Sequence, residues 1–161
     1  MSEQQILNDL WEEHLRHEFA TQDTKATLET MVPDAYVNHI PVLTGGVGRE
    51  QLREFYSRHF IPKMPADTEI VPISRTIGAE RLVDEMIFRF THTIEMDWML
   101  PGIAPTGKRV ECPLVVIVHF RDGKLSYEQY LLGSSFGPGA ARDSRSIQPA
   151  RRRLRNREKV S

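Results

Sequence analysis

Apolar side chains in the first sixty residues recur at the three- and four-residue spacing of amphipathic helices. This spacing predicts one helix over residues 4–20 and another over residues 49–61. Trp11 and His14 fall on the apolar side of the first helix, and Tyr56 falls on that of the other. Each helix is therefore expected to bury one face against a neighbouring layer.

A shorter helix is expected between these two. Asp23 or Thr24 would cap its start, because either side chain can accept a hydrogen bond from a free backbone N–H group. Leu28 and Met31 would lie on its buried side, and Pro33 would end it.

Strand-like patterns occupy the rest of the predicted domain. Residues 35–39 are rich in β-formers and predict a short strand, and the glycines of residues 44–48 predict a flexible turn. Residues 67–77 predict a further strand, which Pro72 places at a sheet edge or a bulge.

The clearest alternation runs over residues 81–95, where Asp84, Phe88 and His92 share one face. A long strand over residues 108–121 follows, and the rest of the pattern is a hairpin turn at Asp122-Gly123 and a return strand over residues 124–130. Three helices and then an antiparallel meander form an α+β pattern, with the helices packed on one side of the sheet.

Composition places the chain among soluble single-domain proteins. Its 161 residues are 40% hydrophobic and 27% charged, and its longest apolar run, residues 113–118, is too short to span a membrane. The single cysteine, Cys112, cannot form an internal disulfide. We therefore expect a cytoplasmic protein without a signal peptide.

Charge divides the chain in two. Eight basic and two acidic residues follow residue 130, so residues 131–161 carry a net charge of +6 and residues 1–130 carry −7. The tail also contains several glycines and prolines and shows no periodicity. We expect a folded domain over residues 1–130 and a basic, disordered tail after it.

Three segments resemble the SnoaL-like polyketide-cyclase branch of the nuclear-transport-factor-two superfamily. They are Tyr36–Pro41, Ala104–Glu111 and Asp122–Gln129, in that order. The resemblance covers residues 5–130 and implies a cone-shaped, curved antiparallel sheet (a cystatin-like α+β barrel) wrapped around one helix, with an apolar cavity. It also implies a homodimer formed through the outer face of the sheet.

The chain departs from the family after Tyr130. Members of this branch continue their last strand with an aromatic–Trp–Asp–Gln segment, which is missing from residues 131–161. A one-nucleotide shift of the codons permits such a segment, so a frameshifted or mis-spliced end is one hypothesis and a genuine basic tail the other. A missing strand would leave residues 108–121 as an exposed edge.

The resemblance also implies the proton-transfer residues. His39 matches the family's histidine and Glu128 its glutamate; the alternatives are a rim histidine held by the backbone and a solvated strand glutamate. His92 and Asp84 are further candidates, because their phase places them beside large apolar residues. The alternatives are a satisfied core histidine for His92 and a solvent-exposed position for Asp84.

Five aromatic residues are candidates to line the substrate cavity, where hydroxyl and indole groups can act as donors. They are Tyr36, Tyr56, Phe88, Trp98 and Tyr130. Ordinary core or lid packing is the alternative for each. The segment 98–105 is expected either to cover the mouth as an apolar lid or to pack against another subunit.

Other kinds of site have little support. HExxH and CxxC motifs are absent, so no metal site or other cofactor is expected. The arginine-rich tail lacks interleaved aromatic residues, so nucleic acid is an unexpected partner.

Family membership implies an enzyme of small hydrophobic carbonyl compounds, an isomerase, aldol-type cyclase or hydrolase of secondary metabolism, with His39 and Glu128 as its proton-transfer pair. One alternative is a non-catalytic module that binds a hydrophobic ligand or forms a dimer. Another is an inactive product of a damaged gene. Fold analogy alone does not decide among them.

Overall fold

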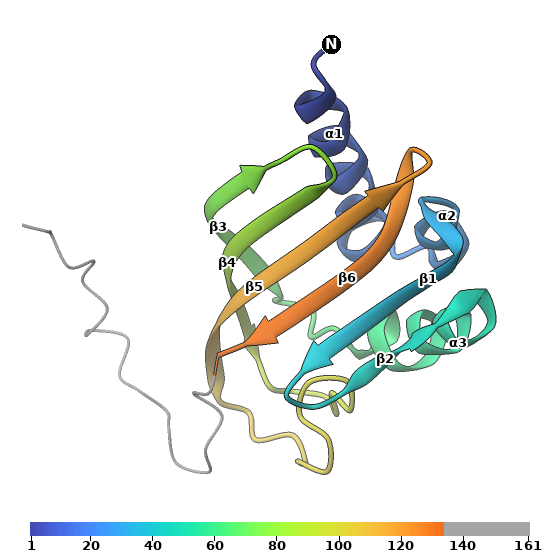
Figure 1. The fold of residues 1–161 in the computed structure, drawn as a ribbon. Coiled ribbons are helices and arrows are strands. Elements are labelled where there is room, and N and C mark those ends of the chain that lie inside the picture. Colours follow the sequence, from blue (N-terminus) through green and yellow to red (C-terminus); the bar gives the residue numbers. More distant parts are fainter. Residues whose placement is uncertain (134–161) are drawn as a thin grey trace, which may run out of the picture.

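The structure is a computed structural model that describes residues 1–133. A curved, unclosed sheet of six strands in the order β2-β1-β6-β5-β4-β3 packs against three helices, and the helices lie on one side of it (Figure 1). The α+β class predicted from the sequence is confirmed. The predicted tail lies outside the described residues apart from residues 131–133.

Helix α1 spans Glu3–Leu15 and continues into a π-helical turn, η1, over Arg16–Ala20. The side chain of Ser2 caps its start by accepting a hydrogen bond from the backbone N–H of Gln5 at 3.1 Å. The widened turn is closed by the N–H of Thr21, which donates to the carbonyl of Arg16 at 2.9 Å. The predicted helix over residues 4–20 is confirmed, with this change of pitch near its end.

Helix α2 spans Thr24–Glu29, and Asp23 caps it as expected by accepting from the N–H of Ala26 at 3.0 Å. The prediction that Met31 belongs to this helix is wrong, because strand β1 already begins there and spans Met31–Ile40. Met31 pairs with Leu125 of the central strand. Sheet pairing thus ends the helix before Pro33.

Residues 44–47 of the predicted flexible turn form an edge strand instead, and Gly48 already belongs to the helix that follows. Strand β2, Thr44–Val47, pairs antiparallel with β1. Gly45 has a φ of 137°, and a Cβ there would lie 2.0 Å from the carbonyl oxygen of Val37. Glycine is therefore needed here for a close approach between two strands.

Helix α3, Gly48–Glu54, follows directly and continues into a second π-helical turn, η2, over Phe55–Phe60. A short 3₁₀ turn, η3, over Ile61–Lys63 ends this helical segment. The predicted helix over residues 49–61 is confirmed. It lies beside β2 and behind the sheet (Figure 1).

The remaining strands form the predicted meander. They are β3 (Glu69–Ile77), β4 (Arg81–Thr91), β5 (Arg109–Arg121) and β6 (Lys124–Leu132). Strand β3 lies at the edge, and its register with β4 shifts just after Pro72. The predicted edge or bulge at this proline is confirmed.

Strand β6 lies in the middle of the sheet, parallel to β1 and antiparallel to β5. Strand β5 is not an edge, because β4 and β6 pair with it on its two sides, so the exposed edge that a missing strand would leave does not arise. The register sets Glu128 beside Val37 and Tyr130 beside His39. The candidate residues Glu128, Tyr130 and His39 therefore lie on neighbouring strands in the sheet.

Candidate functional site

A cluster of titratable side chains is buried between α1 and β6. His14 and Glu18 are four residues apart and therefore lie on one face of the helical segment, and Glu128 comes from the sheet. All three residues are 0% exposed. His14 Nε2 lies 3.1 Å from Glu18 Oε1 and 3.1 Å from Glu128 Oε1. One imidazole thus joins two carboxyl groups.

Hydrogen-bond geometry assigns the protons on His14. The Thr30 hydroxyl donates to the carbonyl of Thr27 at 2.6 Å, so it must accept from His14 Nδ1–H, which lies 2.6 Å away. With Nδ1 carrying a proton, Nε2 can donate toward the carboxyl groups only if the ring is an imidazolium. His14 is therefore the cation of the cluster.

Electrostatics agree with this assignment. Burial alone would lower the pKa of His14, but the charges and hydrogen bonds of Glu128 and Glu18 outweigh it and raise that pKa to about 10. Burial raises the pKa of Glu18, an effect that the His14 charge partly offsets. One oxygen of Glu18, Oε2, is buried without a hydrogen-bond partner. A proton on Glu18 would spare the site a second buried negative charge.

Two tyrosines surround Glu128. The Tyr130 hydroxyl donates to Glu128 Oε2 at 2.9 Å, and the Tyr56 hydroxyl lies 3.5 Å from Oε1, a weak contact. Burial, followed by the charge of Glu128, holds the pKa of each phenol well above its ordinary value. Both hydroxyls therefore stay protonated and act as donors.

The same cluster contains potential metal ligands, which the sequence motifs did not indicate. One ligand atom from each of His14, Glu18 and Glu128 lies within 4.8 Å of the others. The 3.1 Å contacts to Nε2 are hydrogen-bond distances, so a shared proton accounts for the geometry.

Asp84 is buried and belongs to the support of this cluster. It is 3% exposed, so the expectation of a solvent position is wrong. Trp11 Nε1–H donates to Asp84 Oδ2 at 2.9 Å, and Arg75 donates to the same oxygen at 2.7 Å. Trp11 stacks on His14 with ring centroids 5.6 Å apart. Asp84 therefore touches the cluster only through the indole of Trp11.

His39 lies in an aromatic layer next to the cluster. It is 0% exposed and stacks on Tyr130 at 4.5 Å. Its ring centroid lies 5.1 Å from that of Trp98 and 5.5 Å from that of Phe55. His39 is thus a core residue rather than the rim histidine of the alternative, although the backbone does hold it.

The proton of His39 can also be placed. Nδ1 lies 3.1 Å from the carbonyl oxygen of Thr44, so Nδ1 must donate. Burial lowers the pKa of His39 to about 4, although the Thr44 carbonyl and the Glu128 charge act in the opposite direction. The ring is therefore neutral at physiological pH, and Nε2 is a buried acceptor without a partner.

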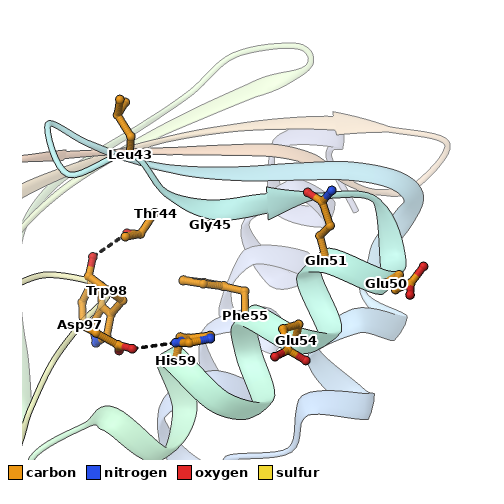
Figure 2. A pocket seen from close by; sticks show the side chains of 10 residues that line it. All are labelled: Leu43, Thr44, Gly45, Glu50, Gln51, Glu54, Phe55, His59, Asp97 and Trp98. Atoms are coloured by element: carbon orange, nitrogen blue, oxygen red, sulfur yellow. Dashed lines mark hydrogen bonds and ion pairs between the residues drawn. The ribbon is translucent and has the colours of Figure 1, made fainter. Parts of the chain in front are cut away.

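A groove of about 850 Å³ opens on the outer side of this aromatic layer. Figure 2 shows its walls: β2 and its turn on one side, α3 with η2 on another, and Asp97 and Trp98 opposite. The Thr44 hydroxyl donates to the carbonyl of Trp98 at 2.5 Å, and His59 Nδ1 donates to Asp97 Oδ2 at 2.7 Å. These two contacts hold the segment between β4 and β5 over the mouth of the cone.

The other sequence candidates fall in different places. Phe88 is buried against Trp98, with ring centroids 5.9 Å apart. His92 is 1% exposed, and its Nδ1 lies 3.2 Å from the Thr106 hydroxyl. Tyr36 does not line the cavity, because strand alternation turns it away from the core. It is 40% exposed and stacks on Tyr127.

Sequence reasoning missed His14, Glu18 and the His59–Asp97 pair as functional groups. A signal existed for the first two, since His14 and Glu18 are polar residues four positions apart on a helix whose apolar face is buried. The contact between His59 and Asp97 joins residues 38 positions apart, and no local pattern indicates it.

Comparison with known families identifies the chain. A family model for a SnoaL-like domain matches residues 11–128, which include every member of the buried cluster. The chain therefore belongs to the SnoaL-like family. A search of curated proteins found no match.

Solved structures share the fold. A candidate SnoaL-like polyketide cyclase from Jannaschia sp. CCS1 is 22% identical, with a TM-score of 0.60 over 78% of this chain and 85% of that one. An NTF2-like protein of unknown function from Burkholderia pseudomallei is 18% identical, with a TM-score of 0.60 over 81% and 90%.

A third similar structure is SalBIII, described as an epoxide hydrolase/cyclase-like enzyme in pyran ring formation in the polyether salinomycin. It is 14% identical, with a TM-score of 0.58 over 83% of this chain and 92% of that one. At these identities the likeness establishes the fold alone. No helix within residues 1–133 is long and apolar enough to cross a membrane.

Proposed function

We propose that this protein is a cofactor-free enzyme that transfers protons on a small hydrophobic carbonyl compound, as an isomerase or aldol-type cyclase. The observation that supports it most strongly is the fully buried His14 cation between Glu18 and Glu128. Burying three ionisable groups is unfavourable unless they are well paired, and strongly perturbed groups concentrate at functional sites.

Glu128 is the general base of the proposed reaction. Its carboxylate would take the proton from the carbon next to the substrate carbonyl, and the electron pair would move onto the carbonyl oxygen. The hydroxyls of Tyr130 and Tyr56, which now approach Glu128, would donate to that oxygen as it becomes an enolate. Proton return at another carbon gives isomerisation, and attack of the enolate on a second carbonyl gives ring closure.

His14 and Glu18 set the charge of the site. The His14 cation would stabilise the negative charge, whether it rests on Glu128 or on the enolate. Glu18 holds the imidazolium from its other side. Neutral His39, with a buried acceptor at Nε2, is the remaining candidate for contact with substrate.

π-Helical turns support a functional reading of the cluster. Such turns are rare, and they occur frequently at functional sites. Glu18 lies in one of them and Tyr56 lies in the other. Both helical segments therefore change pitch at the residues that face Glu128.

Proton exchange tests the proposal directly. Incubation with acetophenone or 2-tetralone in D₂O, followed by proton NMR, measures loss of the protons next to the carbonyl. We expect Glu128→Gln to lower the rate by about a hundredfold or more, and Tyr130→Phe to lower it by about tenfold. Glu29→Gln, at an exposed position of α2, should leave the rate unchanged. Equal rates for the protein and Glu128→Gln would overturn the proposal.

The closed state of the cluster favours one alternative, a non-catalytic binding module. Every cluster residue is 0% exposed, and Trp98, which lies beside His39, is 3% exposed. A substrate must therefore displace part of the aromatic layer to reach Glu128. If ketones bind but no proton exchanges at any pH, the binding module is the better description.

A further inference from the structure

The groove at the mouth has the size and walls of a small-molecule site. Its volume of about 850 Å³ suits a ligand of roughly drug size. Phe55 and Trp98 line it, and the same two rings contact His39 on the inner side. A ligand in the groove, whose lining side chains are drawn in Figure 2, would therefore lie one aromatic layer away from the buried cluster.

The charges of the groove disfavour anions. Within residues 1–133, its lining includes three carboxyl side chains, from Glu50, Glu54 and Asp97, and no lysine or arginine. Arg58 forms an ion pair with Glu54 at 2.9 Å but does not line the groove. An anionic ligand would be repelled by the carboxylates of Glu50 and Asp97, whereas a neutral or cationic ligand would not.

The polar atoms at the His59–Asp97 end of the groove include free acceptors. His59 Nδ1–H donates to Asp97 Oδ2, and in the uncharged tautomer that carries this proton Nε2 is an acceptor. The other oxygen of Asp97, Oδ1, is buried without a partner. The Thr44 hydroxyl already donates its hydrogen bond to the carbonyl of Trp98. A ligand that supplies a donor would satisfy acceptors that the chain leaves open.

We propose that the groove is a binding site for a flat apolar molecule that bears a hydrogen-bond donor, an ammonium or hydroxyl group, and no negative charge. The donor would lie against His59 and Asp97, and the ring would lie against the groove-facing edges of Phe55 and Trp98. This inference rests on the proposed function where it assigns substrate class: the carbonyl compound would carry such a donor at the end that remains in the groove.

Four matched probes test the chemistry: phenethylamine, 2-phenylethanol, 2-phenylethyl methyl ether and 3-phenylpropanoate. The indole N–H signal of Trp98 reports binding in a ¹⁵N–¹H NMR titration, and that of Trp11, the other tryptophan, is the internal control. We expect the amine and the alcohol to bind about tenfold more tightly than the ether, as one hydrogen bond allows. The propanoate should bind more weakly than the ether.

The amine and alcohol arms distinguish the two donors. A tighter amine whose affinity falls with added salt identifies an ammonium site, because exposed charges are screened. Equal affinities identify a hydroxyl or generic donor site. A donor-free ether that binds as well as both, a propanoate that binds best, or a Trp98 signal that no probe shifts would overturn the proposal.

Variants locate the contact. Asp97→Asn and His59→Gln should each remove most of the tenfold preference for donors while keeping the ether affinity. Asp34→Asn, an exposed acid on β1 that pairs with Arg121 outside the groove, should change neither. A donor preference that survives in both groove variants would contradict the assigned contact.

Failure of this inference can be told apart from failure of the proposed function. Glu128→Gln should abolish proton exchange on ketones and leave probe binding in the groove intact, because Glu128 does not line it. Groove binding without any proton exchange would contradict the proposed enzymatic activity and support the proposed ligand site. Proton exchange with no preference for donor-bearing probes would support the proposed enzymatic activity and contradict the proposed ligand site.

Discussion

Two histidine–carboxylate contacts lie on opposite sides of one aromatic layer, and they differ mainly in their access to water. His14, Glu18 and Glu128 have side chains that are at most 1% exposed. The side chains of His59 and Asp97 are 46% and 34% exposed, although their contact of 2.7 Å is shorter. Contact distance alone would wrongly suggest that the His59–Asp97 contact contributes more to stability than the buried cluster does.

The difference shows what burial adds to an ion pair. A charge in the core has lost its hydration and depends on its partners, whereas an exposed charge can return to water. The inner cluster is therefore suited to hold protons at unusual pKa values. The outer pair is suited to receive a ligand from solution.

The largest expected effect comes from making the same substitution on both sides. His14→Leu should lower the free energy of unfolding by about 3–5 kcal/mol, because it leaves two buried carboxyl groups without their cation. His59→Leu should change it by about 0–1 kcal/mol, as for exposed ion pairs. Urea denaturation at pH 7 measures both. Equal losses of unfolding free energy in the two variants would contradict the proposed difference between the buried and the exposed site.

A second effect separates the two sites by pH. The folded-state pKa of His14, about 10, lies above its ordinary value of 6.5, so the folded state holds a proton that the unfolded chain releases. Stability from this group is full below pH 6.5 and is lost as pH rises toward 10. The slope should approach about 1.4 kcal/mol per pH unit. The raised pKa of Glu18 likewise makes stability fall as pH rises.

Denaturation of the two leucine variants across pH 6.5–9.5 checks this slope. His14→Leu should remove most of it, while His59→Leu should retain it. If the protein without any substitution shows no loss of stability over this range, the imidazolium assignment of His14 is wrong.

The smallest effect needs no substitution. The Trp11 indole N–H donates to buried Asp84, whereas the Trp98 indole N–H has no partner in the described structure. The Trp98 proton should therefore exchange with D₂O at least about tenfold faster, through local opening of the mouth. NMR of the two indole signals measures this. Equal exchange rates would show that the mouth opens only when the whole domain does.

Much of the fold follows from local patterns. The patterns over residues 81–95 and 108–121 predicted strands that the structure has at 81–91 and 109–121, and Asp122 and Gly123 set the hairpin between β5 and β6. The boundary of α2 and the strand β2 were predicted incorrectly, because pairing with distant strands decides both. Local propensity is a weak guide where tertiary pairing competes with it.

The candidate site could be predicted only in part. The phase of β6 placed Glu128 and Tyr130 on one face, and the helical pattern placed His14 on the apolar side of α1. The periodicity of the sequence alone could not show that these faces of β6 and α1 contact each other. Tyr36 shows the limit of the approach, since its motif suggested the cavity and its position in the strand turns it outward.

The sequence by itself determined the secondary structure and the buried face of most elements, and it determined the family. Spacing along the chain contains this information, because helices and strands repeat every 3.6 and 2 residues. Only the tertiary structure decided that Glu128 meets His14 and that His59 meets Asp97. Those contacts depend on the strand order that places β6 centrally, and on segments far apart in the chain being held together by the same core.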